Sequence, residues 1–317
     1  MDKLEINCLV IGYGSIGSRH ACLLKAMGCH VQVVSKRVVE TFQYYGSIKE
    51  AMQHTEFDYI VISNDTSEHY SSFVELNKLG YAGKLLIEKP VFSRLDVLPK
   101  QAEFNNVFVA YNLRFHPVIQ KLHAFIQDKK LYSIQAYAGQ YLPNWRSGSG
   151  YTRCYSASRE RGGGAIRDLS HELDYINWLT GGWKRVTAIG GKFSDLRIDS
   201  DDVFSLLFDT ENCPVISVQM NYLDQKPRRE MIINLKDFSI KADLIKDYLE
   251  INGETIQVEV DRDLTYELQH KAILHGDFSV ACTLEQGMDV LSLISAAELA
   301  ADGRKWVNKA EMDLFPI

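Results

Sequence analysis

The sequence predicts an α/β protein with an N-terminal doubly wound parallel sheet of the Rossmann type and a C-terminal α+β domain with a large, mainly antiparallel open sheet. Three observations support this prediction. An apolar run over residues 8–11 breaks into the spaced glycines Gly12, Gly14 and Gly17 and then becomes helical. Strand-like and helical segments then alternate, which indicates a parallel sheet. From about Leu131, strand-like runs follow one another with few helices between them, which indicates antiparallel pairing.

The composition is that of a globular protein. The chain of 317 residues is 46% hydrophobic and 24% charged, and it is long enough for two domains. Its net charge of −6 and its lack of a dense Lys/Arg block argue against a nucleic-acid or membrane-surface partner, since both require a basic surface. No apolar run reaches the roughly 18 residues of a membrane span, so we expect a cytoplasmic protein. The six cysteines lack metal-type spacing, and we expect no metal.

The two sheets are predicted strand by strand. A β-branched run over residues 31–34 completes the first βαβ unit. Further strands of the parallel sheet are expected at residues 58–63, 84–87 and 107–111. Those of the second sheet are expected at residues 132–141, 185–190, 202–208, 215–222, 231–235 and 248–260, the last with a hairpin turn at Asn252-Gly253, before a final helix over residues 284–301. We expect domains of residues 1–116 and 117–317.

The glycine run predicts a dinucleotide site. Gly12 permits a tight turn, Gly14 lets the backbone approach phosphates, and Gly17 lets the helix pack against the strand. The helix N-terminus then presents amides to the anion. The expected pyrophosphate contacts are therefore Gly12, Tyr13, Gly14, Ser15, Ile16 and Gly17.

The end of the second strand reads Ser35-Lys36-Arg37. NAD sites usually carry an acidic residue here for the ribose hydroxyl, whereas a cation accommodates a 2′-phosphate. Two cations and a hydroxyl favour NADP, and NAD remains the alternative.

Polar stretches follow three further strands at the edge where open α/β sheets bind ligands. They are Asn64-Asp65-Thr66-Ser67-Glu68-His69, Glu88-Lys89-Pro90 and Tyr111-Asn112-Leu113-Arg114. A fourth stretch, residues 162–174, opens a helix in the second domain. On a helical wheel its Asp168, His171, Tyr175 and Trp178 lie opposite an apolar stripe, which predicts a face that meets a ligand.

In combination, the glycine loop, Glu88-Lys89-Pro90, the run at residues 111–117 and the Gly-Gly-Gly…Asp…His…Asp helix resemble the glucose-fructose oxidoreductase / inositol dehydrogenase (Gfo/Idh/MocA) family. The resemblance implies a pyridine-nucleotide oxidoreductase acting on sugars, nucleotide sugars or cyclitols. It implies that Lys89, Asp168 and His171 lie at the reacting carbon, and that the open face of the second sheet forms a homo-oligomer, a dimer or a tetramer. The implied cofactor contacts are Asn64, Thr66, His69, Glu88, Asn112 and Arg114, and we add Asp65 in the same turn.

Hydride transfer from a secondary alcohol leaves a hydroxyl proton that a base must remove. With reference pKa values of about 6.5 for His and about 10.4 for Lys, a neutral imidazole is far more abundant than a neutral amine at pH 7. We therefore expect His171 to be the base, Lys89 to polarise the substrate oxygen, and Asp168 to fix a substrate hydroxyl or orient the imidazole. Lys89 is the alternative base if burial lowers its pKa.

Aromatic residues alternate with arginines from Tyr141 to Arg159. Such a segment suits the apolar face of a sugar ring and an anionic substituent. We expect Trp145, Arg146 and Tyr155 to contact substrate. A non-catalytic cofactor-binding sensor on the same fold is the alternative function, because a fold alone does not establish catalysis.

Overall fold

The computed structural model describes residues 6–99, 104–145 and 150–312. The chain divides into two compact units. The first comprises Met1–Asn112 and Asp263–Gly287, and the second comprises Leu113–Arg262 and Met288–Ile317. The sequence-based division between residues 116 and 117 assigned Asp263–Gly287 to the second domain, whereas this segment packs in the first unit.

The first unit contains a mostly parallel sheet. Its described strands, in spatial order, are β15 (Cys282–Thr283), β6 (Val107–Val109), β5 (Lys84–Ile87), β4 (Tyr59–Ile62), β1 (Asn7–Ile11), β2 (His30–Val34) and β3 (Gln43–Tyr45). Only β15 pairs antiparallel among them. The strand order reverses between β1 and β4, because the chain runs outward to β3 and starts again at β4. Ligands bind open α/β sheets at the carboxyl ends of strands beside such a reversal.

Helices cover both faces of this sheet, as the burial of its strands requires. The helices are α1 (Ser15–Ala26), α2 (Ile48–His54), α3 (Thr66–Lys78) and α8 (Leu264–His275), and α1 contacts α8 while α2 contacts α3. Every residue of β4 is fully buried, without the alternation of a half-exposed strand. The predicted doubly wound sheet is thus confirmed.

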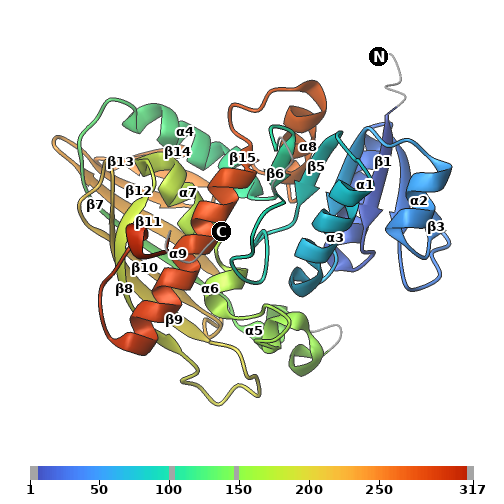
Figure 1. Ribbon diagram of the computed structural model, residues 1–317. Helices are drawn as coiled ribbons and strands as arrows, with labels where there is room; N and C mark the ends of the chain where they lie inside the picture. Colours follow the sequence, from blue (N-terminus) through green and yellow to red (C-terminus); the bar gives the residue numbers. More distant parts are fainter. Residues whose placement is uncertain (1–5, 100–103, 146–149, 313–317) are drawn as a thin grey trace. The chain divides into compact units, whose positions relative to one another are not determined.

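The second unit contains a larger sheet (Figure 1). Its described strands, in spatial order, are β14 (Glu254–Gln257), β13 (Tyr248–Ile251), β12 (Ser239–Asp243), β11 (Arg228–Leu235), β7 (Leu131–Gly139), β10 (Ile216–Asn221), β9 (Val203–Thr210), β8 (Trp183–Gly191) and β16 (Val307–Asn308). Neighbours pair antiparallel except β7 and β10. The predicted hairpin is present: Asn252 and Gly253, both with positive φ, join β13 to β14.

One face of this sheet carries helices. The helix α4 (Pro117–Ile126) contacts β12 and β13, α6 (Ala165–Asp168) contacts β9 and β10, and α7 (His171–Thr180) contacts β7. Alternate residues of β9, such as Phe204, Leu206 and Phe208, are buried on this covered face. The opposite face is open, so the predicted α+β domain with an open, mainly antiparallel sheet is confirmed.

The long helix α9 (Leu284–Gly303) begins in the first unit's segment and continues in the second. It matches the final helix predicted from the sequence. Short elements complete the second unit: α5 (Leu142–Trp145), the 3₁₀ turns η2 (Tyr151–Arg153) and η3 (Tyr155–Ala157), and α10 (Lys309–Met312).

Candidate functional site

The turn between β1 and α1 requires two glycines. Gly12 has a φ of +94°, and a Cβ there would lie 2.5 Å from the backbone nitrogen of Asn64. A Cβ on Gly17 would lie 1.9 Å from the carbonyl oxygen of Gly12. The hydroxyl of Ser63 donates to the carbonyl oxygens of Ile11 and Gly12 at 3.1 and 3.0 Å, which ties this turn to the end of β4. No residue with a side chain fits at either glycine without moving this backbone.

Gly14 differs, because a Cβ built there meets no atom within 4 Å. Gly14 is the N-cap of α1 and has no side chain to cap the helix, and the first turn contains no acidic residue. The first amides of a helix lack intrahelical acceptors and carry the positive end of its dipole. The space in front of Gly14 is therefore open, faces N–H donors and suits the pyrophosphate of a dinucleotide.

The segment after β2 is a tight turn. The amide of Ser35 donates to the carbonyl of Tyr45 at 3.0 Å, and the hydroxyl of Ser35 accepts from the amide of Arg37 at 3.0 Å. Lys36 Nζ lies 2.8 Å from Glu68 Oε1 of α3, and both side chains are exposed. Lys36, one of the two predicted cations, is thus paired with a carboxylate, whereas Arg37 is exposed at the tip of the turn.

The segment after β4 begins with Asn64. Its Nδ2 donates to Ser72 Oγ at 2.9 Å, while its buried Oδ1 has no hydrogen-bond partner among the residues that the structure describes. Asp65 is the N-cap of α3, and Thr66, which is buried, is its first residue. An acceptor at Asn64 is therefore available to a ligand beside the glycine turn.

His69 lies inside the first unit, with only 1% of its surface exposed. Its Nε2 is 3.1 Å from the carbonyl oxygen of Asn64, and its Nδ1 is 3.2 Å from those of Pro90 and Val91. Burial lowers the pKa of His69. The ring thus connects the segments after β4 and β5, and its predicted contact with a cofactor stays a prediction.

The segment after β5 carries Glu88 and Lys89. Glu88 Oε1 is 2.9 Å from His20 Nε2, and Glu88 Oε2 accepts from the amide of Lys89 at 3.1 Å. Burial by itself raises the pKa of Glu88, but the hydrogen bond from His20 and the charge of Lys89 bring it below its usual value. Asn112 is also buried, and its Nδ2 donates to Thr265 Oγ1 at 2.7 Å.

In the second unit, Asp168 is the last residue of α6, and its Oδ2 accepts a 2.8 Å hydrogen bond from the hydroxyl of Tyr222. The ring of Trp145 meets that of Tyr222 edge to face at 6.3 Å. The carbonyl oxygen of Tyr155 would lie 2.2 Å from a Cβ on Gly163, so this glycine lets η3 approach α6. The structure thus brings two of the predicted residues, Trp145 and Asp168, against Tyr222 and places Tyr155 beside the start of α6. The predicted Arg146 lies outside the described residues.

Asp201 lies at the start of α6. Its backbone carbonyl accepts from the amide of Ala165 and its Oδ2 from that of Ile166, both at 3.0 Å. Gly164 has a φ of +129°, and a Cβ there would lie 2.1 Å from Asp201 Oδ1. Burial raises the pKa of Asp201 to about 7. These contacts fix the backbone that leads to Asp168.

The predicted single helix over this region is wrong. The chain leaves α6 after Asp168 and starts α7 at His171, so Leu169 and Ser170 separate two helices. The predicted free face is wrong as well, because Tyr175 is fully buried and donates to Glu172 Oε1 at 3.2 Å. Asp168 and His171 instead lie on either side of the break between the helices.

Arg114 lies in the second unit, where it forms a buried ion pair with Asp174. Its Nη2 is 2.7 Å from Asp174 Oδ1, and its Nε is 3.0 Å from Oδ2. Its guanidinium also lies over the ring of Trp178 at 5.4 Å. Arg114 therefore stabilises this unit internally, and a direct role at the cofactor stays a prediction.

Sequence reasoning missed Tyr222, His20 and His270. Tyr222 ends the predicted strand 215–222, and a phenol at the carboxyl end of a strand is the one signal that pointed to it. His20 and His270 contact each other at 2.8 Å but lie 250 positions apart, so no local pattern indicated them.

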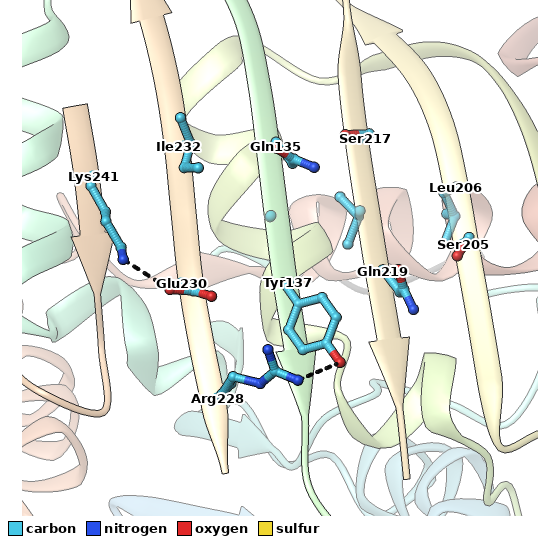
Figure 2. A pocket seen from close by; sticks show the side chains of 12 residues that line it. Gln135, Tyr137, Ser205, Leu206, Ser217, Gln219, Arg228, Glu230, Ile232 and Lys241 are labelled. Atoms are coloured by element: carbon cyan, nitrogen blue, oxygen red, sulfur yellow. Dashed lines mark hydrogen bonds and ion pairs between the residues drawn. The ribbon is translucent and has the colours of Figure 1, made fainter. Parts of the chain in front are cut away.

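The open face of the second sheet carries a shallow hollow of about 410 Å³ (Figure 2). Lys241 Nζ lies 3.4 Å from Glu230 Oε2, and Arg228 Nη2 lies 3.5 Å from the hydroxyl of Tyr137. Exposed apolar side chains on the same sheet include Ile189, Leu207 and Ile232.

The described ranges lack two features, a membrane-spanning helix and a metal site. They contain no helix with the length and apolarity to traverse a bilayer. They also bring together no group of three His, Cys, Asp or Glu side chains in a metal-binding arrangement.

Residues 119–259 match the GFO/IDH/MocA C-terminal domain. This part of the chain is a Gfo/Idh/MocA domain. The predicted resemblance to the family is thereby confirmed. Among curated proteins, the chain is 24% identical over 138 residues to YteT of Bacillus subtilis (strain 168), which is provisionally assigned as an oxidoreductase. That match covers 42% of this chain and about a third (32%) of the relative's length.

Solved structures share the fold of the Gfo/Idh/MocA domain and of the first unit. GenD2 from gentamicin A biosynthesis, in complex with NAD, has a TM-score of 0.78 at 17% identity, with 97% of each chain covered. Levoglucosan dehydrogenase with NADH has a TM-score of 0.82 at 15% identity, covering 96% of this chain and 99% of that one. The WlbA dehydrogenase of Bordetella pertussis, with NADH and UDP-GlcNAcA, has a TM-score of 0.76 at 16% identity, covering 96% and 98%.

Proposed function

We propose that this protein is an NAD(P)-dependent oxidoreductase that transfers a hydride between nicotinamide and a secondary alcohol or ketone of a sugar, nucleotide sugar or cyclitol. The observation that supports this most strongly is the open space at Gly14 before the N-terminus of α1, which fits a pyrophosphate. The structures of similar fold with bound NAD, NADH, UDP-GlcNAcA or L-sorbose support the cofactor and substrate class.

The dinucleotide would be held by the backbone of residues 12–17 and by polar groups at the ends of β2, β4 and β6. Ser35 and Arg37 would contact the adenosine ribose, with NADP preferred. Asn64 offers its buried Oδ1 as an acceptor. When bound, nicotinamide supplies the hydride acceptor or donor that the protein lacks.

In the direction of alcohol oxidation, His171 accepts the hydroxyl proton of the substrate. The ammonium of Lys89 holds and polarises the substrate oxygen. His171 is preferred to Lys89 as the base because a neutral imidazole is far more abundant than a neutral amine at pH 7. Asp168, held by Tyr222, binds a substrate hydroxyl or orients the imidazole.

Trp145 and Tyr155 provide aromatic surface for a sugar ring in the second unit. Trp145 packs against a buried group of apolar residues that includes Leu142 and Tyr222, so its ring is held in place. An anionic sugar or nucleotide sugar accounts for the arginines of this segment, among them Arg146.

The proposal is tested by screening uronic acids, nucleotide sugars and inositols for reduction of NADP or NAD. Lys89→Met, His171→Ala and Asp168→Asn should each lower kcat at least about 100-fold, as expected for loss of acid–base or charge stabilisation. Dinucleotide affinity should stay within about twofold for the two second-unit variants, since these contact substrate. Tight dinucleotide binding with no turnover of any candidate would refute the enzyme and favour a sensor.

We also propose that two or more copies associate through the open face of the second sheet. Its exposed Ile189 and Leu207 are apolar side chains of the kind that interfaces bury. Light scattering should show an oligomer for the native protein and a monomer for Leu207→Lys. Val38→Lys, at an exposed position of the first unit, is the control that should leave the mass unchanged. A native monomer would contradict this association.

A further inference from the structure

Four buried polar side chains of the first unit form one continuous hydrogen-bonded series. The hydroxyl of Tyr59 in β4 is 2.9 Å from Nδ1 of His270 in α8. Nε2 of His270 is 2.8 Å from Nδ1 of His20 in α1, and Nε2 of His20 is 2.9 Å from Glu88 Oε1. Tyr59, His20 and His270 are fully buried, and Glu88 is 8% exposed. We call these four residues the buried relay.

With both imidazoles neutral, the chemistry of the four groups assigns every proton in the buried relay. A carboxylate only accepts, so His20 must carry its proton on Nε2 to donate to Glu88. His20 Nδ1 then accepts from Nε2–H of His270, and His270 Nδ1 accepts from the hydroxyl of Tyr59. In this arrangement each ring is neutral and uses each of its nitrogens once; the alternative arrangement is an imidazolium at His20 that donates to both Glu88 and His270.

The surroundings favour this arrangement. Burial lowers the pKa of His270 and raises the pKa of Tyr59. A neutral imidazole and a protonated phenol are the forms that the assignment requires. With both rings neutral, reversing all the donors would place a lone pair of His20 against Glu88, which a carboxylate cannot tolerate without taking up a proton.

One residue of the buried relay, His270, comes from a segment that is distant in sequence from the other three. His270 belongs to Asp263–Gly287, which follows β14 of the second unit in sequence and yet packs within the first unit. Its helix also supplies Thr265, which receives the hydrogen bond from Asn112. A buried series of polar side chains contributes little net stability compared with apolar packing. Its expected effect is to fix these side chains in one orientation.

We propose that Tyr59, His270 and His20 are positioning residues that hold the Glu88 carboxylate in one orientation, so that its Oε2 fixes the backbone of Lys89. The link from Glu88 to Lys89 is the 3.1 Å hydrogen bond from the Lys89 amide. The inference rests on the proposed function, because it is as a candidate catalytic group that Lys89 requires such positioning.

The first test needs neither substrate nor mutation. In protein labelled with ¹⁵N-histidine, long-range ¹H–¹⁵N spectra distinguish the two imidazole tautomers. We expect His20 and His270 both to be neutral and protonated on Nε2 near pH 7. A Nδ1–H tautomer or an imidazolium at either residue would overturn the inference, even if the protein proves to be an active oxidoreductase.

The second test removes one hydroxyl. Tyr59→Phe keeps the ring but leaves His270 Nδ1 without its donor, so the Glu88 carboxyl resonance in ¹³C spectra should titrate at higher pH than in the native protein. The other titratable groups near Glu88 are Lys89 and His69, which the variant leaves in place. The matched control is Tyr45→Phe, which removes a buried tyrosine's bond to Gln43 outside the relay.

For an active native enzyme, Tyr59→Phe should lower kcat about five- to tenfold, the effect of about one lost hydrogen bond, while KM stays within about twofold. Tyr45→Phe should leave both constants unchanged. Equal Glu88 titration in the two variants would refute the positioning role. A native protein without turnover would refute the proposed function, whereas the tautomers and the Glu88 titration would still decide whether the relay exists.

Discussion

The hydroxyl of Tyr222 donates a 2.8 Å hydrogen bond to Asp168 Oδ2, and neither residue exposes more than 2% of its surface. Burial raises the pKa of Tyr222, and the adjacent carboxylate adds to this shift, so the phenol stays a donor. The residue that follows β10 therefore sets the direction in which the Asp168 carboxylate points.

Tyr222→Phe should lower kcat about tenfold, because the Asp168 carboxylate then loses a hydrogen bond worth about 1.5 kcal/mol, the value for a bond to a charged group. The dinucleotide Kd should not change. Tyr137→Phe on the open face of the same sheet is the control, and steady-state kinetics with the substrate found in the screen checks both. Equal kcat values for the two variants would remove Tyr222 from the site.

Cofactor preference depends on Arg37 more than on Lys36. Lys36 already lies 2.8 Å from Glu68, so its charge is partly neutralised. Arg37→Ala should weaken NADP binding about tenfold, as expected for a charged hydrogen bond, and change NAD binding less than about twofold. Lys36→Ala should have a smaller effect, and Glu68→Gln should increase NADP affinity. Fluorescence titrations measure all three, and a preference for NAD in the native protein would contradict this assignment.

Stability should fall as the pH decreases below about 6.5, the reference pKa of an unfolded histidine. Burial, and then the charge of Arg229, lower the pKa of His116 to about 4, so the folded protein keeps this imidazole neutral while the unfolded chain takes up a proton. The unfolded state binds more protons in this interval, which makes stability increase with pH. At pH 5, proton uptake by the unfolded His116 lowers the free energy of unfolding by about 2 kcal/mol.

His116→Asn tests this linkage. The side chain of His116 caps α4 by accepting from the amide of Val118 at 3.2 Å, and asparagine caps helices equally well without titrating. The loss of unfolding free energy between pH 7 and pH 5 should therefore be about 2 kcal/mol smaller in the variant. An identical pH dependence in urea unfolding would show that His116 does not titrate as stated.

Removing one partner of the buried ion pair between Arg114 and Asp174 should strongly destabilise the protein. Arg114→Met leaves a buried carboxylate, so the free energy of unfolding should fall by about 3–5 kcal/mol. The exposed pair of Arg185 and Asp209 provides the comparison, and Arg185→Met should cost less than about 1 kcal/mol. If denaturant unfolding shows similar losses of unfolding free energy for Arg114→Met and Arg185→Met, the pair of Arg114 and Asp174 does not behave as a buried ion pair.

Local patterns predicted most of the fold. The glycine turn, the parallel strands and the Asn252-Gly253 hairpin follow from periodicity and turn chemistry within about ten residues, which a sequence displays directly. The return of Asp263–Gly287 to the first unit was missed because it depends on pairings such as His20 with His270, which no local pattern carries.

The site was predicted in its residue types and less well in its geometry. The helical wheel placed Tyr175 on a free face because it assumed one continuous helix, whereas the break at Leu169 and Ser170 separates α6 from α7. His69 and Arg114 carry polar groups that also suit a ligand, yet the folded units use them for internal contacts. In the sequence Tyr222 is an ordinary strand residue, because its hydrogen bond to Asp168 depends on the fold and not on a local pattern.

The space before Gly14 is proposed to hold the pyrophosphate of NADP or NAD, and Gly14→Ala tests this most directly. An added Cβ meets no atom of the protein within 4 Å, so the variant should unfold at the same temperature as the native protein. Calorimetric titration with NADPH and NADH should show binding to the native protein and at least a tenfold weaker affinity for Gly14→Ala, because the methyl group occupies the position of the phosphates. Equal affinity in a folded Gly14→Ala variant, or no binding of either dinucleotide to the native protein, would contradict the account.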